Sequence, residues 1–207
     1  MNHPDFLNTP IDLHAVIDGL KGRHSCRICI YGPPGTGKTT FGHWLSRELN
    51  LPLVSKLASD LMSMYVGGTE QKIAAAFEDA RENGTILMID EVDTFLRDRS
   101  LATRSWEVSQ VNELLVQMER FEGIFIASTN LMDNLDAASM LRFDLKLEFG
   151  YLREEQAERL LARHCAATGL GLPDKESVRI IRALGNATPG DFANAARQHA
   201  FRGFTSP

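Results

Sequence analysis

The chain has 207 residues, of which 43% are hydrophobic, and a formal net charge of -5. This length suffices for one ordinary hydrophobic core with a small additional unit. Lysine and arginine are interleaved with acidic residues, so the charge pattern predicts no surface for nucleic acid or for an anionic membrane. No apolar run approaches the ~18 residues of a membrane-spanning helix, and the first residues lack a signal-peptide pattern. We therefore expect a soluble cytoplasmic protein.

Residues 1–25 are polar and are interrupted by Pro4, Pro10 and Gly22. Hydrophobic residues recur at helical spacing only between residues 12 and 20, which predicts one short helix there. We interpret this segment as a lead-in to a domain that begins at residue 26.

Cys26 and Cys29 form an isolated C-x-x-C pattern, and Cys165 is far away in the sequence. A structural zinc site needs a second pair of ligands, so the pattern does not predict a metal site. Both cysteines lie in a short apolar run, residues 26–31, which is typical of a strand. There they are expected to be small core residues, or one is buried and the other faces the opposite way.

The residues after that strand read Gly-Pro-Pro-Gly-Thr-Gly-Lys-Thr, which meets the complete P-loop spacing G-x-x-x-x-G-K-[ST]. Glycines let the backbone turn tightly, so that consecutive N–H groups converge on a polyphosphate at the start of a helix. Lys38 is expected to reach the β- and γ-phosphates, and the Thr39 hydroxyl is expected to bind Mg²⁺. The predicted nucleotide-binding residues are Gly32, Pro33, Pro34, Gly35, Thr36, Gly37, Lys38, Thr39 and Thr40.

Helix and strand patterns alternate after this loop. We predict helices over residues 39–49, 59–64 and 69–81, and a strand over residues 52–56. The run from Tyr65 to Gly68 interrupts the pattern between the second and third of these helices, and Asn83-Gly84 ends the third.

A predicted strand over residues 85–91 contains four consecutive apolar residues and ends in Asp90 and Glu91. Such a run suits a strand covered on both faces, and two carboxylates at its end are costly unless they are used. In this Walker B pattern, Asp90 would hold Mg²⁺ through water, and Glu91 would polarise the water that attacks the γ-phosphate. The alternative is an acidic strand-to-loop turn.

The next elements are a charged loop, a helix over residues 105–121 and a strand over residues 123–128 that ends in Thr129-Asn130. Parallel strands gather ligands at their carboxyl ends, so Asn130 could hold the attacking water together with Glu91. Alternatively, Asn130 only caps a turn. A short helix over residues 135–141 and an edge strand over residues 144–149 follow.

The strand pattern ends at Gly150, and three helices are predicted over residues 153–167, 174–184 and 189–202. Thr188 and Asp191 resemble a capping box at the start of the last helix. The predicted fold class is α/β, with a parallel P-loop sheet over residues 26–150 and a small all-α lid over residues 151–207.

Together, the motifs at residues 32–39 and 86–91, Asn130 and the helical tail resemble the AAA clade of the AAA+ ATPases, from about Ile28 to about Phe201. The resemblance implies five strands in the order 5-1-4-3-2, ATP and Mg²⁺ as ligands, ATP hydrolysis and a ring-shaped homo-oligomer, expected to be a hexamer. It also implies that Asn130 occupies the sensor-1 position.

The segment from Ser59 to Glu70 is similar to the one that carries the first pore loop in protein-remodelling members of that family. The resemblance implies that Tyr65, Val66 and Gly67 line a central pore and grip an extended polypeptide. From the residues alone, a tyrosine that merely closes a helix is an equal alternative. The same resemblance implies that Trp106 lies near the position of the second pore loop.

The segment from Leu141 to Asp144 is similar to the motif that supplies an arginine finger, so Arg142 would act on the γ-phosphate held by a neighbouring subunit. Family members often carry a second arginine nearby, which is absent here, and Arg97, Arg99 and Arg104 are the alternatives. Other clades place an arginine near the start of the last helix, where this chain has Gly190, which is expected to allow close approach to the nucleotide.

These observations lead to the hypothesis of an ATP-driven module for protein remodelling or unfolding. Its expected partners are copies of itself, a polypeptide substrate, and an adaptor or appended recognition domain. The alternative is a nucleotide-dependent loader or scaffold that hydrolyses ATP slowly and threads nothing. A third possibility, a nucleic-acid motor, is disfavoured by the acidic charge balance.

Overall fold

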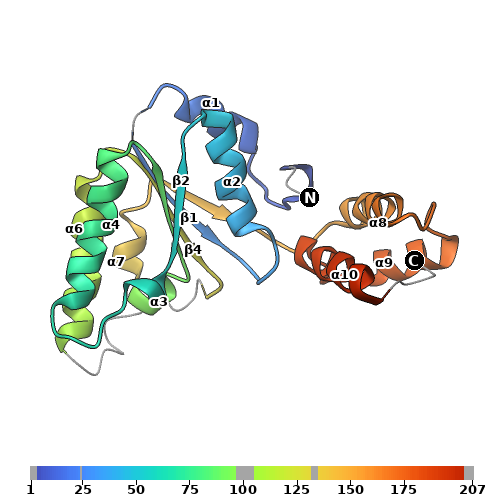
Figure 1. The fold of residues 1–207 in the computed structure, drawn as a ribbon. Helices are drawn as coiled ribbons and strands as arrows, with labels where there is room; N and C mark the ends of the chain where they lie inside the picture. The colour runs from blue at the N-terminus through green and yellow to red at the C-terminus, as the bar shows by residue number, and fades with distance from the viewer. Residues whose placement is uncertain (1–3, 24, 97–104, 132–134, 203–207) are drawn as a thin grey trace.

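The computed structural model describes residues 4–23, 25–96, 105–131 and 135–202 (Figure 1). Five parallel strands form one sheet in the order β2-β3-β4-β1-β5, which confirms the predicted order read from the opposite edge. The strands are β1 (Cys26–Tyr31), β2 (Leu53–Leu57), β3 (Ile86–Asp90), β4 (Ile124–Thr129) and β5 (Leu145–Glu148).

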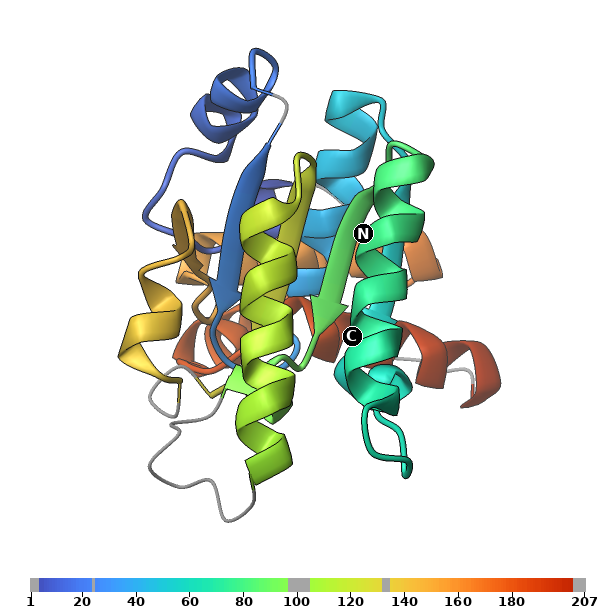
Figure 2. The same cartoon turned by 90° about the vertical axis from the view of Figure 1, so that its left-hand side faces the viewer.

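Helices cover both faces of the sheet (Figure 1). One face packs against α1 (Leu13–Leu20) and α2 (Lys38–Leu49). The other packs against α3 (Ala58–Leu61), α4 (Gly68–Glu82), α5 (Asp93–Leu96), α6 (Ser105–Arg120) and α7 (Ala137–Met140). Figure 2 shows α4 and α6 side by side in front of the strands. Both faces of the central strands are therefore removed from water, as their continuous apolar runs predict.

The two cysteines of β1 illustrate this arrangement. Cys26 packs in the core beneath α1 and α2, whereas Cys29 packs in the core beneath α4 and α6. Burial raises the pKa of Cys29 to about 12 and that of Cys26 to about 11, with a further contribution from Asp144 at Cys26. Both thiols stay protonated at neutral pH, so they act as small core residues on opposite faces.

One predicted helix is shorter in the structure. The helix expected over residues 59–64 is only α3, of four residues, because Met62 adopts extended backbone with ψ 148°. Residues 62–67 consequently form a loop before α4. The sequence did not predict α5 or the 3-10 helix η1 (Pro4–Phe6), since each is too short to show a periodic pattern.

The C-terminal helices α8 (Glu154–Thr168), α9 (Lys175–Ala183) and α10 (Pro189–Arg202) form a separate small unit beside the sheet domain (Figure 1). We call this unit the lid. It has its own core, made by Leu152, Ala157, Leu160 and Phe192 together with Phe6 from the N-terminal segment. None of the described helices combines the length and the apolar character needed to cross a bilayer.

The N-terminal segment connects these two units. Phe6 packs in the lid core, while the next residue, Leu7, packs in the sheet core. The carbonyl of Asp5 accepts a hydrogen bond from Gln156 at 2.8 Å, and the carbonyl of Asn8 accepts one from the Gly150 amide at 2.8 Å. The predicted lead-in thus contributes side chains to both cores.

Candidate functional site

The loop between β1 and α2 has the backbone geometry that its glycines allow. Gly32, Gly35 and Gly37 have φ angles of 139°, 80° and 100°, which other residues rarely adopt. At Gly32 the space is also closed, because an added Cβ would lie 1.9 Å from the carbonyl oxygen of Phe149. The loop therefore turns tightly against the end of β5 and leads directly into α2.

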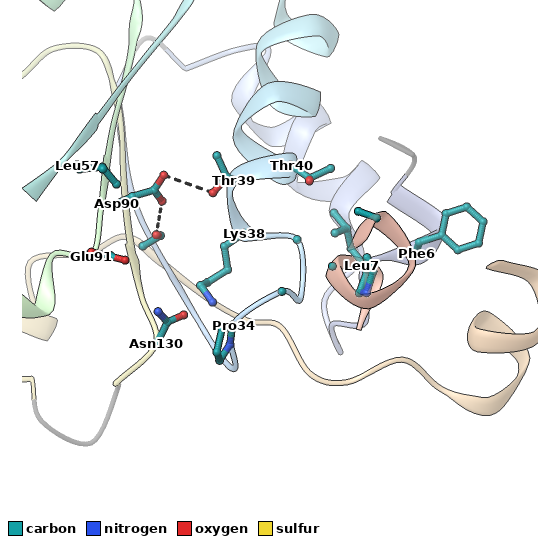
Figure 3. Close-up of a pocket in the computed structure, with 16 residues that line it drawn as sticks. Phe6, Leu7, Pro34, Lys38, Thr39, Thr40, Leu57, Asp90, Glu91 and Asn130 are labelled. Carbon is teal, nitrogen blue, oxygen red and sulfur yellow. Dashed lines mark hydrogen bonds between the residues drawn. The ribbon is translucent and has the colours of Figure 1, made fainter. Parts of the chain in front are cut away.

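A cavity of about 420 Å³ opens beside this loop, at the carboxyl edge of the sheet (Figure 3). Its lining comes from the N-terminal segment, the P-loop and α2, the ends of β2, β3 and β4, and the lid. Ten of the residues predicted from the sequence line it: Pro34, Gly35, Gly37, Lys38, Thr39, Thr40, Asp90, Glu91, Asn130 and Gly190. The structure thus brings together predicted residues that are up to 156 residues apart in the chain, as between Pro34 and Gly190.

Lys38 is folded back onto its own loop. Its ammonium donates hydrogen bonds to the carbonyl oxygens of Gly32 at 2.8 Å and Pro33 at 2.9 Å. Burial lowers the pKa of Lys38 to about 8, an effect that the negative charge of Asp90 opposes. The Thr36 hydroxyl donates to the Pro33 carbonyl at 2.8 Å, so it also orders the loop. A phosphate near Lys38 would add negative charge that favours the protonated form of this buried amine.

Hydroxyl groups surround Asp90 at the end of β3. Its carboxylate accepts hydrogen bonds from Thr39 at 3.3 Å, from Ser55 at 3.5 Å and from Ser128. The Thr39 hydroxyl and the Asp90 carboxylate are oxygen donors of the kind that Mg²⁺ prefers, with phosphates and water in its remaining positions. These residues fit the predicted ion. The described part of the chain contains no group of three or more His, Cys, Asp or Glu side chains that could hold a metal by themselves.

Glu91 and Asn130 follow neighbouring strands and both line the cavity (Figure 3). Glu91 has a φ of 61°, an uncommon conformation for a residue other than glycine. Backbone strain of this kind costs about 1–3 kcal/mol and clusters at functional sites. The turn directs the chain from β3 toward α5 immediately after the two carboxylates, and it leaves Glu91 exposed at the cavity wall.

Gly190 lines the cavity from the lid, but its close contact is with the P-loop. The Gly190 amide donates to the Gly35 carbonyl at 2.9 Å, and an added Cβ would lie 2.9 Å from the Gly35 Cα. The predicted capping box is present, since the Thr188 amide donates to Asp191 at 2.8 Å and the Asp191 amide donates to Thr188 at 3.3 Å. The start of α10 is therefore fixed directly against the phosphate-binding loop.

Sequence reasoning missed six residues that line the cavity: Phe6, Leu7, Leu57, Ser128, Pro189 and Ala193. Phe6 and Leu7 are buried and form an apolar wall opposite Asp90 (Figure 3). In the sequence, Phe6 and Leu7 are visible only as an apolar pair in an otherwise polar segment, and such a pair does not by itself indicate a ligand-binding site.

Arg142 lies outside the cavity, next to the start of β5. The nearby Asp144 pairs with Arg27, the second residue of β1, whereas the P-loop follows the opposite end of that strand. The Arg142 Nε donates to Glu119 at 2.5 Å, and the Arg142 side chain is 35% exposed. It is thus remote from the phosphate-binding loop of its own chain. The alternatives Arg97, Arg99 and Arg104 lie outside the described residues, as does the side chain of Trp106.

The loop of residues 62–67 projects three consecutive apolar side chains into solvent. The exposed fractions are 97% for Met64, 80% for Tyr65 and 95% for Val66. Gly67 follows with a φ of 78° and precedes the first residue of α4. Tyr65 therefore does not close a helix against the core, which was the alternative interpretation.

Comparisons with known proteins agree with this architecture. The family described as AAA, the ATPase family associated with various cellular activities, matches residues 28–151. The cell division cycle protein 48 homolog of Archaeoglobus fulgidus is 35% identical over 144 residues, which are 66% of this chain and 20% of that protein. The ATP-dependent zinc metalloprotease FtsH 4 of Sphaerobacter thermophilus is 33% identical over 210 residues, which are 95% of this chain and 30% of that protein. The chain thus spans less than a third of the length of these relatives.

Among solved structures, the AAA domain of FIGL-1 in complex with ADP superposes with a TM-score of 0.68 at 24% identity. The superposition covers 84% of this chain and 60% of that one, and it shows the same fold. Because the family match extends over more than half of the sequence and includes both phosphate-site motifs, the chain belongs to the AAA family of ATPases.

Proposed function

We propose that this chain binds ATP with Mg²⁺, hydrolyses the ATP, and uses the energy to remodel polypeptides within a ring of identical copies. The observation that carries the proposal is the convergence of Lys38, Thr39, Asp90, Glu91 and Asn130 on one cavity beside the P-loop. The solved relative in complex with ADP supports a nucleotide as the ligand.

Each of these residues has a chemical task in the proposed site. Lys38 exchanges its two carbonyl partners for phosphate oxygens, and Thr39 and Asp90 hold Mg²⁺. Bound Mg²⁺ supplies positive charge next to the phosphates. Glu91 orients and polarises the attacking water, and the Asn130 amide holds that water on the other side.

Arg142 would complete the site of a neighbouring copy. Its position away from its own phosphate-binding loop and its partial exposure support action in trans. To reach a neighbour's γ-phosphate, it would leave Glu119. An arginine supplied in this way contributes about 10³-fold or more to the rate of phosphoryl transfer. The ring, with a hexamer as the expected size, would therefore be required for full activity.

The exposed apolar side chains of Met64, Tyr65 and Val66 support a polypeptide as the substrate. An aromatic and two aliphatic side chains without a charge can contact an extended chain irrespective of its sequence. One relative is named as an ATP-dependent metalloprotease, which agrees with action on proteins.

The experiment that tests this function compares ATP turnover with and without an unfolded polypeptide, for the assembled wild type and for Tyr65→Ala. We expect the polypeptide to stimulate the wild type, and Tyr65→Ala to keep basal turnover while losing stimulation and unfolding of a tagged substrate. If the polypeptide does not change ATP turnover by the wild type, the result would favour the alternative function of a nucleotide-dependent loader or scaffold. If Tyr65→Ala still unfolds the tagged substrate, the loop of residues 62–67 is not the part of the chain that contacts the polypeptide.

A further inference from the structure

The loop of residues 62–67 has an exposed tip and an ordered base. At the base, the Thr69 hydroxyl accepts a hydrogen bond from the Ser63 amide at 3.0 Å, and Thr69 is only 1% exposed. The Ser63 hydroxyl in turn accepts from the Tyr65 amide at 3.2 Å, and the Gly68 amide donates to the Tyr65 carbonyl at 3.0 Å. A buried hydroxyl at the start of α4 therefore fixes the entry to the loop.

Lys72, one turn further along α4, holds the other side of the base. Its ammonium donates to the carbonyl oxygens of Asp60 at 3.1 Å and Met62 at 2.7 Å. Asp60 belongs to α3, and Met62 is the first residue after it. Carbonyls at a helix end carry partial negative charge, so a lysine there is a favourable partner. Lys72 thereby ties the end of α3 to α4.

The opposite end of α3 reaches the nucleotide cavity. Leu57 lines the cavity and directly precedes α3, and its amide donates to the Asp60 carboxylate at 3.1 Å. Only the single turn of α3 separates this cavity residue from the loop that carries Tyr65. A displacement of Leu57 would therefore be passed to the loop, provided that the base of the loop holds together.

We propose that Thr69 and Lys72 are positioning residues for the loop of residues 62–67. They hold its base to α4, so that Met64, Tyr65 and Val66 point outward as a unit and follow α3 when the content of the cavity changes. Neither residue touches a substrate in this scheme. The inference rests on the proposed function only where it names a polypeptide as what the loop contacts.

The test uses two matched pairs of variants in the full chain. Thr69→Val removes the hydroxyl and keeps the shape, whereas Thr69→Ser keeps the hydroxyl; Lys72→Met removes the charge, whereas Lys72→Arg keeps it. Hydrogen exchange is followed at the amides of residues 62–68, and ATP turnover is titrated with an unfolded polypeptide. Arg81→Met is the control, because Arg81 lies at the far end of α4 and pairs with Glu78.

We expect Thr69→Val and Lys72→Met to speed exchange in the loop about tenfold or more, as the loss of a charge-assisted or buried hydrogen bond implies. The polypeptide concentration for half-maximal stimulation should rise in both, with basal turnover unchanged. Thr69→Ser, Lys72→Arg and Arg81→Met should behave as the wild type. Since Lys72 is exposed, Lys72→Met keeps the test available if Thr69→Val does not fold.

Two outcomes separate the inference from the proposed function. Wild-type exchange rates at residues 62–68 in both Thr69→Val and Lys72→Met would overturn the positioning role, whatever the turnover. Faster exchange in these variants, combined with a wild type that no polypeptide stimulates, would support the positioning role and reject the polypeptide function.

Discussion

The amide of Gly190 donates a hydrogen bond to the carbonyl of Gly35 at 2.9 Å, so the first turn of α10 rests on the P-loop. The contact has no room for a side chain on the lid side, since a Cβ on Gly190 would lie 2.9 Å from the Gly35 Cα. Backbone contact thus couples the orientation of the lid to the shape of the phosphate-binding loop.

Gly190→Ala should weaken nucleotide binding. The added methyl group must push α10 away from the P-loop or distort that loop, and overpacking of this kind costs about 1–3 kcal/mol. Titration calorimetry with ADP measures the effect. Gly185→Ala serves as the control, because a Cβ there meets nothing within 4 Å. Equal affinity in the two variants would show that the contact does not influence the cavity.

Lys38→Ala should abolish detectable nucleotide binding, and wild-type affinity should fall as the pH rises above 8. The pKa of Lys38 is lowered by burial to about 8, so the amine of the free protein loses its charge above that pH, whereas a bound phosphate favours the charged form. Binding then requires uptake of a proton. The affinity for ADP between pH 7 and 9.5, measured in buffers of different ionisation enthalpy, tests this directly.

The lowered pKa of Lys38 also affects the free energy of unfolding. Raising the pH above 8 should weaken nucleotide binding but increase the stability of the folded chain. The unfolded chain keeps Lys38 protonated up to the ordinary lysine pKa of 10.5, while the folded chain, in which burial lowers the pKa, releases the proton at about 8. Between these values the unfolded state binds more protons, so the contribution of Lys38 to the free energy of unfolding rises with pH. Urea unfolding of the wild type and Lys38→Met at pH 8 and 10 would show the difference. A parallel pH dependence of the two proteins would contradict the shift.

Glu91→Gln should bind ATP and hydrolyse it slowly. The amide keeps the size of the side chain but cannot polarise water as a carboxylate does, and the loss of such a group typically costs 10²-fold or more in rate. Single-turnover hydrolysis measures the chemical step, with ADP affinity as the check on binding. Hydrolysis at the wild-type rate would exclude Glu91 from the mechanism.

Turnover per chain should rise with protein concentration in the wild type and stay flat in Arg142→Ala. If Arg142 acts in a neighbouring site, only assembled protein has complete sites, and the variant should lose about 10³-fold of the assembled rate. Oligomer mass is read under the same conditions. Arg120→Ala, at an exposed arginine that ends α6, is the matched control. Activity that is independent of concentration and of Arg142 would indicate a self-contained site.

Much of the sheet domain is predictable from the sequence because its signals are local. The strand predicted over residues 26–31 coincides with β1, and the strand predicted over residues 85–91 extends one residue beyond each end of β3. The glycine pattern identifies the P-loop, whose φ values only glycine tolerates easily. Asn130 was placed beside Glu91 because neighbouring parallel strands end at one edge.

The rest depends on contacts between distant segments. The apolar character of Phe6 and Leu7 does not reveal that they pack in different cores, and nothing near Gly190 in the sequence indicates Gly35 as its neighbour. The helix predicted to reach Met64 ends at Leu61, and the residues that follow it bond to Thr69 and Lys72 of α4. A local sequence pattern cannot reveal hydrogen bonds between the residues after α3 and side chains of α4.

The adjacent residues Phe6 and Leu7, held in two different cores, limit how the lid can move. Consecutive Cα atoms are about 3.8 Å apart, so this connection cannot stretch without pulling one side chain out of its core. The chain crosses between the two units a second time at Gly150 and Tyr151, where Asn8 bonds to both residues. The lid is therefore connected to the sheet domain at two places. Movement of the whole lid away from the sheet would have to break the contacts at both crossings, so we expect the lid to rotate about them when the cavity opens.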